Sequence, residues 1–200
     1  MTNNEHTRHK ARMIKKKQHI DQRIAAANES RGIILVLTGN GKGKTTAAFG
    51  NVARCIGHGY HTGIIQFIKG DWPCGERQLL EQTGRATFHV MKTGFTWETQ
   101  DKTVDIAATQ EVWKAGKVML SDPNLRLVVL DEITYVLRYG YLAIEEVMSA
   151  LQQRPAMQSV IITGRGCPQA LIDIADTVSD IQPVKHAFDA GIQAQEGIDW

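Results

Sequence analysis

Short apolar runs recur along the chain from residue 32, and the stretches between them carry apolar residues at helical spacing. The run GIILVLT at residues 32–38 lacks strict polar alternation, which is typical of a strand buried on both faces. Further strands are predicted at 63–69, 86–91, 126–131, 159–163 and 177–181, and helices at 44–57, 103–120, 142–152 and 168–175. Strands that alternate with helices predict an α/β fold with a mostly parallel central sheet and helices on both faces.

The first thirty residues follow a different pattern. Four apolar residues share one helical face at spacings of seven, four and three: Met13, Ile20, Ile24 and Ala27. Lysines at 15–17 interrupt this region with charge, and an isolated helix this polar is marginal in water. We therefore expect a basic helical arm at 1–30 that orders only against something, then one domain at 31–200 that is irregular beyond residue 183.

Composition narrows the class of protein. Hydrophobic residues make up 42% of the chain, which is enough to build a core. No apolar run approaches the roughly 20 residues that cross a bilayer, and no secretory signal is visible. Cys55, Cys74 and Cys167 form no CxxC pair, so a disulfide framework or zinc site is not expected. These features predict a cytoplasmic protein that does not span a membrane.

The net charge of +2 hides an asymmetry. Residues 1–31 carry +5 and the remainder carries −3. The basic arm is open to interpretation as a solvated tail or as a nucleic-acid-binding segment. Aromatic residues do not interleave its basic ones, so we expect no nucleic-acid partner.

The strongest chemical signal follows the first predicted strand. It comprises Gly39, Asn40, Gly41, Lys42, Gly43, Lys44, Thr45 and Thr46. Glycines let successive amides point at phosphate oxygens, and the predicted helix that follows adds its dipole. Lys44 supplies a full charge and Thr45 a hydroxyl for a bridging Mg²⁺, so the segment predicts a P-loop. Thr38 stands where the usual pattern has its first glycine; the alternative is a glycine-rich turn without a ligand.

A second motif, LVVLDE at residues 127–132, ends an apolar strand in two acids. Asp131 and Glu132 would emerge at the carboxyl edge of the sheet, beside the P-loop, where a carboxylate can hold Mg²⁺ directly or through water. Solvated acids at a strand end are the alternative. Together the two motifs predict binding of a nucleoside triphosphate with Mg²⁺.

These motifs leave the reaction open. Glu132 could orient water in an ATPase, and a kinase would need an acceptor site. A nucleotide-dependent binding module is a further possibility that the motifs alone do not exclude.

Longer segments of the chain resemble the P-loop corrinoid adenosyltransferases. The similar segments are GNGKGKTTAAFG (39–50), QFIKG (66–70), WPCGER (72–77), TGFTW (93–97), LDEITY (130–135), ITGRG (162–166) and VKHAFDAGIQAQEGID (184–199). They stand in the family's order from about residue 31 onward. The resemblance implies a RecA-like P-loop fold, in which we expect the first strand to lie centrally, beside the strand that ends in Asp131.

The resemblance also implies a reaction. The family transfers the 5′-deoxyadenosyl group of ATP to Co(I) of a reduced corrinoid (cobalamin, cobinamide or cobyrinic acid diamide) and releases triphosphate, in adenosylcobalamin biosynthesis or salvage. The substrate supplies the nucleophile, so the protein contributes positioning and electrostatics. Lys44, the loop amides and Mg²⁺ (or Mn²⁺) would stabilise charge on the departing triphosphate.

The match carries residue roles over to this chain. Thr45 and Glu132 are implied as metal ligands, with Asp131 as an alternative ligand or a supporting residue. Phe95 and Trp97 match the aromatic pair that presses on the corrin face and displaces its lower ligand; taken without the family, they read as ordinary core residues. Arg165 could contact phosphate or a corrinoid side chain, or be a plain turn cation.

The resemblance finally implies partners. The family suggests a homodimer in which the N-terminal helix of one subunit closes over the corrinoid site of the other. It also suggests reduced flavodoxin as the electron donor.

Overall fold

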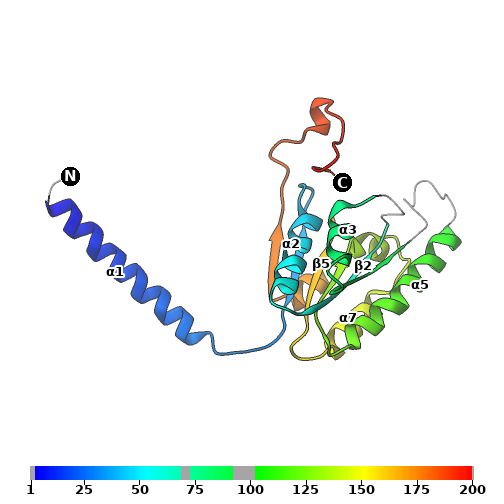
Figure 1. The fold of residues 1–200 in the computed structure, drawn as a ribbon, viewed down its shortest axis with the longest axis horizontal. Helices are drawn as coiled ribbons and strands as arrows, with labels where there is room; N and C mark the ends of the chain where they lie inside the picture. The colour runs from blue at the N-terminus through cyan, green and yellow to red at the C-terminus, as the bar shows by residue number, and fades with distance from the viewer. Residues whose placement is uncertain (1–2, 69–72, 92–101, 200) are drawn as a thin grey trace. The chain divides into compact units, whose positions relative to one another are not determined.

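The computed structural model describes residues 3–68, 73–91 and 102–199 and divides the chain into two compact units, residues 1–30 and 31–200 (Figure 1). Each unit is described by itself. No helix among the described residues is long and apolar enough to span a membrane.

The first unit contains one continuous helix, α1 (Asn3–Ala26). The helix is regular over 24 residues. Its lysines, arginines, glutamines and alanines favour helix, and Glu5 in the first turn and Arg23 in the last complement the helix dipole. The apolar side chains along it are exposed: Met13, Ile14, Ile20 and Ile24.

The second unit is built on a six-stranded sheet in the order β3-β2-β4-β5-β1-β6, and each neighbouring pair is parallel. The strands are β1 (Ile34–Thr38), β2 (His61–Gln66), β3 (Ala86–Val90), β4 (Leu125–Asp131), β5 (Ser159–Thr163) and β6 (Thr177–Asp180). Every strand expected from the sequence is present, and the boundaries differ by three residues or fewer. The predicted α/β fold with a parallel central sheet is confirmed.

The expected position of the first strand is wrong. β5 lies between β1 and β4, with Val160 aligned with Ile34 on one side and Val128 on the other. β1 therefore lies one strand from the edge, between β5 and β6. The order of the strands depends on how the long crossover connections pack on the sheet. The sequence pattern of a single strand does not encode that packing.

Helices cover both faces of the sheet (Figure 1). They are α2 (Lys44–Gly57), α3 (Gly75–Glu81), α5 (Lys102–Ser121), α6 (Ile133–Arg138), α7 (Ile144–Gln153) and α8 (Gln169–Ile174). α2 and α3 pack on one face through Phe49, Val52 and Leu80, and the others pack on the opposite face around Trp113. The short helices α3 and α6 were not expected from the sequence, since neither is long enough to show a clear period.

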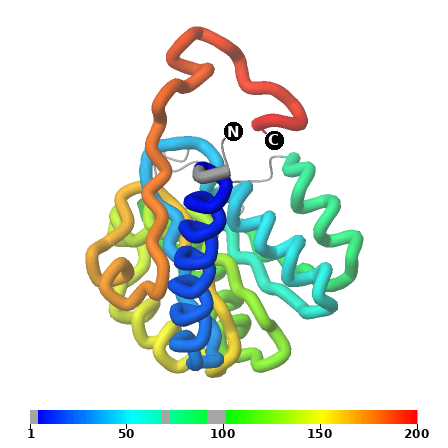
Figure 2. Tube along the Cα trace, turned by 90° about the vertical axis from the view of Figure 1, so that its left-hand side faces the viewer, coloured from blue at the N-terminus to red at the C-terminus, as the bar shows by residue number. Residues whose placement is uncertain are grey.

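The segment after β6 is irregular, as expected, apart from the 3-10 helix η1 (Phe188–Ala190). Figure 2 shows that it runs out beyond the sheet and then turns back toward the domain. Residues 181–199, called the C-terminal segment below, therefore return to the side on which the strands end.

Candidate nucleotide site

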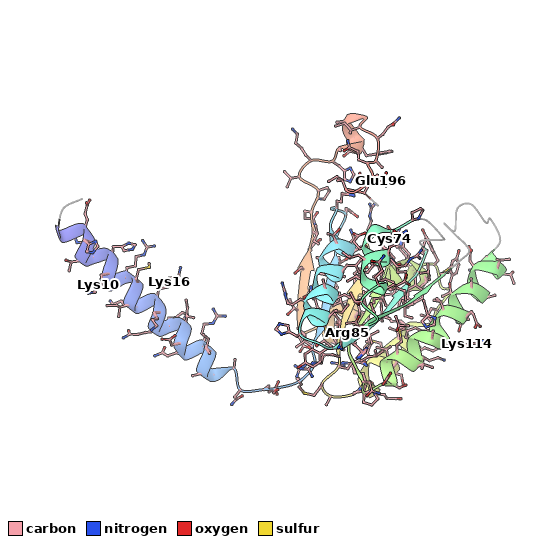
Figure 3. All side chains as sticks on the ribbon, viewed as in Figure 1. Lys10, Lys16, Cys74, Arg85, Lys114 and Glu196 are labelled. Atoms are coloured by element: carbon pink, nitrogen blue, oxygen red, sulfur yellow. The ribbon has the colours of Figure 1, made fainter. Side chains whose placement is uncertain are left out.

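The carboxyl ends of the parallel strands face a cavity of about 620 Å³. In Figure 3, Cys74, which lines it, lies on the side of the C-terminal segment marked by Glu196, while Arg85 lies at the other end of the sheet. The cavity is lined by residues 41–46, Gln66, Phe67, Ile68, Pro73, Cys74, Glu76, Arg77, Glu132, Tyr135, Tyr139, Arg165, His186, Ile198 and Asp199. Ligands of open α/β sheets bind at this edge.

The predicted phosphate loop joins β1 to α2 at this cavity. Gly43 has a φ of 113°, a left-handed conformation that favours glycine, and α2 begins directly after it at Lys44. The loop thus turns sharply into a helix N-terminus, the arrangement that binds anions. Residues 41–46 line the cavity, whereas Gly39 and Asn40 do not.

Thr38 explains the departure from the usual loop pattern. Its hydroxyl donates to the carbonyl of Gly164 at 3.0 Å, and its oxygen accepts the amide of Cys167 at 3.4 Å. The side chain ties the end of β1 to the turn after β5. A glycine at this position would lose both contacts.

Lys44 is buried, with 6% of its surface exposed. Its ammonium donates to the carbonyl of Gly41 at 2.7 Å. Burial lowers the pKa of Lys44, and the charge of Arg165 lowers it further, while the carboxylates of Glu132 and Asp131 raise it. An anionic ligand in the cavity would restore the solvation that this ammonium has lost.

Asp131 is fully buried and lies at the centre of a hydrogen-bond network. Its Oδ1 accepts the hydroxyls of Thr45 at 2.9 Å and Thr163 at 2.7 Å, and its Oδ2 accepts the amide of Gln66 at 3.1 Å. Three strand ends and the start of α2 therefore meet at one carboxylate. Asp131 itself does not line the cavity. Its carboxylate orients the hydroxyl of Thr45, which does line the cavity.

Glu132 reaches the cavity by an unusual backbone turn. Its φ is 61°, an αL conformation uncommon outside glycine, and its amide donates to the hydroxyl of Thr163 at 2.9 Å. Strain of this kind persists where surrounding contacts hold it, often at functional sites. The turn starts α6 and leaves Glu132 in the lining of the cavity.

The oxygen donors fit a hard divalent cation that is shared with phosphates. Among the described residues no group of three or more His, Cys, Asp or Glu side chains forms a self-sufficient metal cage. Mg²⁺ is typically bound through one or two carboxylates plus substrate phosphates and water. Thr45 and Glu132, with Asp131 behind them, match that donor set.

The remaining predicted site residues divide into two groups. Arg165 lines the cavity, and its carbonyl accepts the hydroxyl of Thr134 at 2.9 Å, which fixes the turn after β5. Phe95 and Trp97 lie outside the described residues. The network described above therefore concerns the nucleotide side of the site.

Several residues of the site carried no role in the sequence analysis. Gln66 and Thr163 are polar residues at the carboxyl ends of buried strands, and that position is the signal that could have found them. Tyr135 and Tyr139 line the cavity with ring centroids 6.2 Å apart. Burial, reinforced by the charge of Glu132, raises the pKa of Tyr135, so its hydroxyl stays protonated at neutral pH.

Several known proteins similar to this chain are named corrinoid adenosyltransferases. A family model described as ATP:corrinoid adenosyltransferase BtuR/CobO/CobP matches residues 30–200. Corrinoid adenosyltransferase CobA of Salmonella typhimurium is 61% identical over 96% of this chain and 98% of that protein. The corrinoid adenosyltransferase of Escherichia coli is 56% identical over 96% and 98%. That of Pseudomonas aeruginosa is 48% identical over 96% of both chains.

Among solved structures, a looser similarity is to a KaiC-like protein of Pyrococcus horikoshii, with a TM-score of 0.45 and 13% identity over 78% of this chain and 75% of that one. The family model and the relatives match almost the whole chain, including the loop at 39–46 and the acids at 131–132. By that match, the chain belongs to the ATP:corrinoid adenosyltransferase family.

Proposed function

We propose that this protein transfers the 5′-deoxyadenosyl group of ATP to Co(I) of a reduced corrinoid. A cobalt–carbon bond forms with the electron pair of Co(I), the bond from C5′ to the triphosphate oxygen breaks, and that oxygen keeps the bonding pair. The observation that carries the proposal is the phosphate loop with its buried Lys44, in a chain that is 61% identical to a named corrinoid adenosyltransferase.

The loop binds the whole triphosphate as a leaving group. Lys44 has lost hydration through burial, so its charge acts strongly on phosphate oxygens nearby. Negative charge grows on the triphosphate as the C5′ bond breaks, and a preorganised cation stabilises that charge more than the ground state. Residues 42–46, which line the cavity, supply the remaining phosphate contacts.

Thr45 and Glu132 would hold Mg²⁺ (or Mn²⁺), which neutralises charge on the phosphates when it is bound. The buried carboxylate of Asp131 accepts a hydrogen bond from the Thr45 hydroxyl and so fixes the direction of that hydroxyl. Thr163 and Gln66 hold Asp131 in place. The protein thus contributes a rigid set of oxygens beside a cationic loop.

The corrinoid side of the site rests on the family match. Phe95 and Trp97 would form the apolar wall that excludes the lower ligand of Co(II), since four-coordinate cobalt is easier to reduce. Arg165, which lines the cavity, would contact the corrinoid or the phosphates. The remaining assignments are a cytoplasmic homodimer, an N-terminal helix that closes the partner's corrinoid site, and reduced flavodoxin as electron donor.

A product assay tests the proposal. The protein is incubated with Mg-ATP and chemically reduced cobalamin, and the cobalt–carbon bond is followed by its absorbance. One inorganic triphosphate should appear per adenosylated corrinoid, and none without corrinoid. Lys44→Ala should abolish both products, whereas Lys114→Ala on α5 (labelled in Figure 3), far from the cavity lining, should not. ADP and phosphate formed without corrinoid would instead identify an ATPase.

A further inference from the structure

The C-terminal segment is joined to the phosphate loop by an ion pair. The ammonium of Lys42 contacts the carboxylate of Asp199, 157 residues away in sequence. The other carboxylate oxygen of Asp199 accepts the amide of Gln195 at 2.8 Å, which orients the group. The hydrogen bond from Lys42 holds the pKa of Asp199 below its usual range, so the carboxylate is charged at neutral pH.

The same segment meets the loop again where it begins. The amide of Gly41 donates to the carbonyl of Ile181 at 2.6 Å, so this loop amide is already paired within the protein. A Cβ on Gly41 would lie 2.7 Å from that carbonyl, and one on Gly39 would lie 2.4 Å from it. Glycines here let the two backbones approach, and the segment is therefore attached to the loop near both its ends.

Between these attachments the segment forms one wall of the cavity through His186, Ile198 and Asp199. Most of it is exposed; Val184 is 96% exposed and Phe188 77%. A segment with so few buried apolar contacts opens at low free-energy cost. The contact with Lys42 is therefore one that a ligand can exchange.

Electrostatics favours that exchange. The Lys42 and Asp199 side chains are 48% and 25% exposed, and a solvent-exposed ion pair of this kind is weak. A triphosphate brings several negative charges to the same cavity, where Lys44 and Arg165 also attract it. Asp199 also lines the cavity, and its negative charge would repel a triphosphate. The triphosphate and Asp199 would therefore compete for Lys42.

We propose that Asp199 competes with the triphosphate for Lys42, so that triphosphate binding detaches the Asp199 end of the C-terminal segment from the loop while the bond at Ile181 remains, and re-formation of the pair promotes release of the triphosphate. The inference rests on the proposed function for the identity of the anion. Binding and detachment are linked, so each weakens or strengthens the other by the same factor.

Inorganic triphosphate with Mg²⁺ is the probe, titrated calorimetrically into the full chain. Asp199→Asn removes the competing charge. The Kd of this variant for triphosphate should be about two- to fivefold lower than that of the wild type, the range expected for an exposed ion pair. Asp189→Asn, in η1 of the same segment but outside the cavity lining, is the matched control and should leave the Kd unchanged. An unchanged or weaker affinity of Asp199→Asn, or no binding to the wild type, overturns the inference.

Trypsin cleavage after the exposed Lys185 reports the position of the segment. Triphosphate should accelerate this cleavage in the wild type, and Asp199→Asn should be cleaved at the faster rate without ligand. Protection by triphosphate in the wild type would overturn the inference, since the segment would then close on the ligand. If corrinoid adenosylation fails while Asp199→Asn still binds triphosphate more tightly, the proposed function is wrong and the competition stands.

Discussion

Thr163 donates its hydroxyl to Asp131 at 2.7 Å across the neighbouring strands β5 and β4, and the same oxygen accepts the amide of Glu132 at 2.9 Å. One side chain therefore sets the positions of both acids. It also stabilises the αL backbone that leaves Glu132 in the lining of the cavity.

Thr163→Val keeps the shape of the side chain and removes both hydrogen bonds. A hydrogen bond to a charged group contributes about 1.5–3 kcal/mol, so kcat/KM for Mg-ATP should fall at least roughly tenfold. Thr163→Ser keeps the hydroxyl and should retain most of the activity. Equal losses in the two variants, measured by steady-state kinetics, would mean that packing and not hydrogen bonding is what Thr163 provides.

Lys44→Met tests the buried charge. Because burial lowers the pKa of Lys44, its charge costs stability in the nucleotide-free protein. The variant should gain about 1 kcal/mol at pH 7, or about 3 °C in Tm, and lose the stabilisation by ATP. The gain should shrink as the pH rises through the lowered pKa toward 10.5, because the wild-type lysine is then neutral. Thermal unfolding with and without ATP measures both effects, and a lower Tm without ATP would contradict the prediction.

Asp176 anchors the start of the domain. Its carboxylate accepts Arg31 at 3.0 Å and the amide of Ile34 at 2.8 Å, and these bonds, the Arg31 one foremost, lower its pKa to about 2. The stabilisation is present above pH 4 and is lost as the pH falls from about 4 to 2, because the unfolded carboxyl protonates first.

Asp176→Asn should lower the free energy of unfolding by about 1 kcal/mol at pH 7, a value discounted for partial exposure. Urea titrations at pH 7 and pH 3 measure it. The difference from the wild type should be smaller at pH 3, and Asp189→Asn should show no such difference. A difference that is constant with pH would exclude the ion pair as its cause.

Trp97→Ala tests the proposed corrin wall. Activity that starts from chemically reduced Co(I) should survive better than activity that starts from Co(II) with a reductase, because the wall is needed to remove the lower ligand before reduction. The two rates are compared in the same preparation. An equal loss in both assays would refute the role of the aromatic pair.

Deletion of residues 1–25 tests the proposed lid. Corrinoid binding should weaken while ATP affinity stays close to the wild type, because the phosphate loop belongs to the unit at 31–200. Equilibrium titrations with cobalamin and with ATP separate the two. If ATP binding falls as much as corrinoid binding, the arm supports the fold and does not close the corrinoid site.

The strands and the nucleotide-binding motifs of this protein could be predicted from the sequence. The phosphate loop and the acids 131–132 are contiguous segments that follow apolar strands, and their types and order already imply a nucleotide with a metal ion. The strands were located because buried parallel strands are apolar throughout. The short helices α3 and α6 escaped notice because one or two turns show no clear period.

Contacts between distant segments were decided by the tertiary structure alone. The hydrogen bonds that Asp131 accepts from Thr163, Gln66 and Thr45 join residues 32, 65 and 86 positions apart in sequence. The ion pair between Lys42 and Asp199 joins residues 157 positions apart. β5 also enters between β1 and β4 against expectation. A sequence pattern predicts which residues are buried and which are charged. The order of the strands and the partner of each polar group depend instead on how the crossover connections pack.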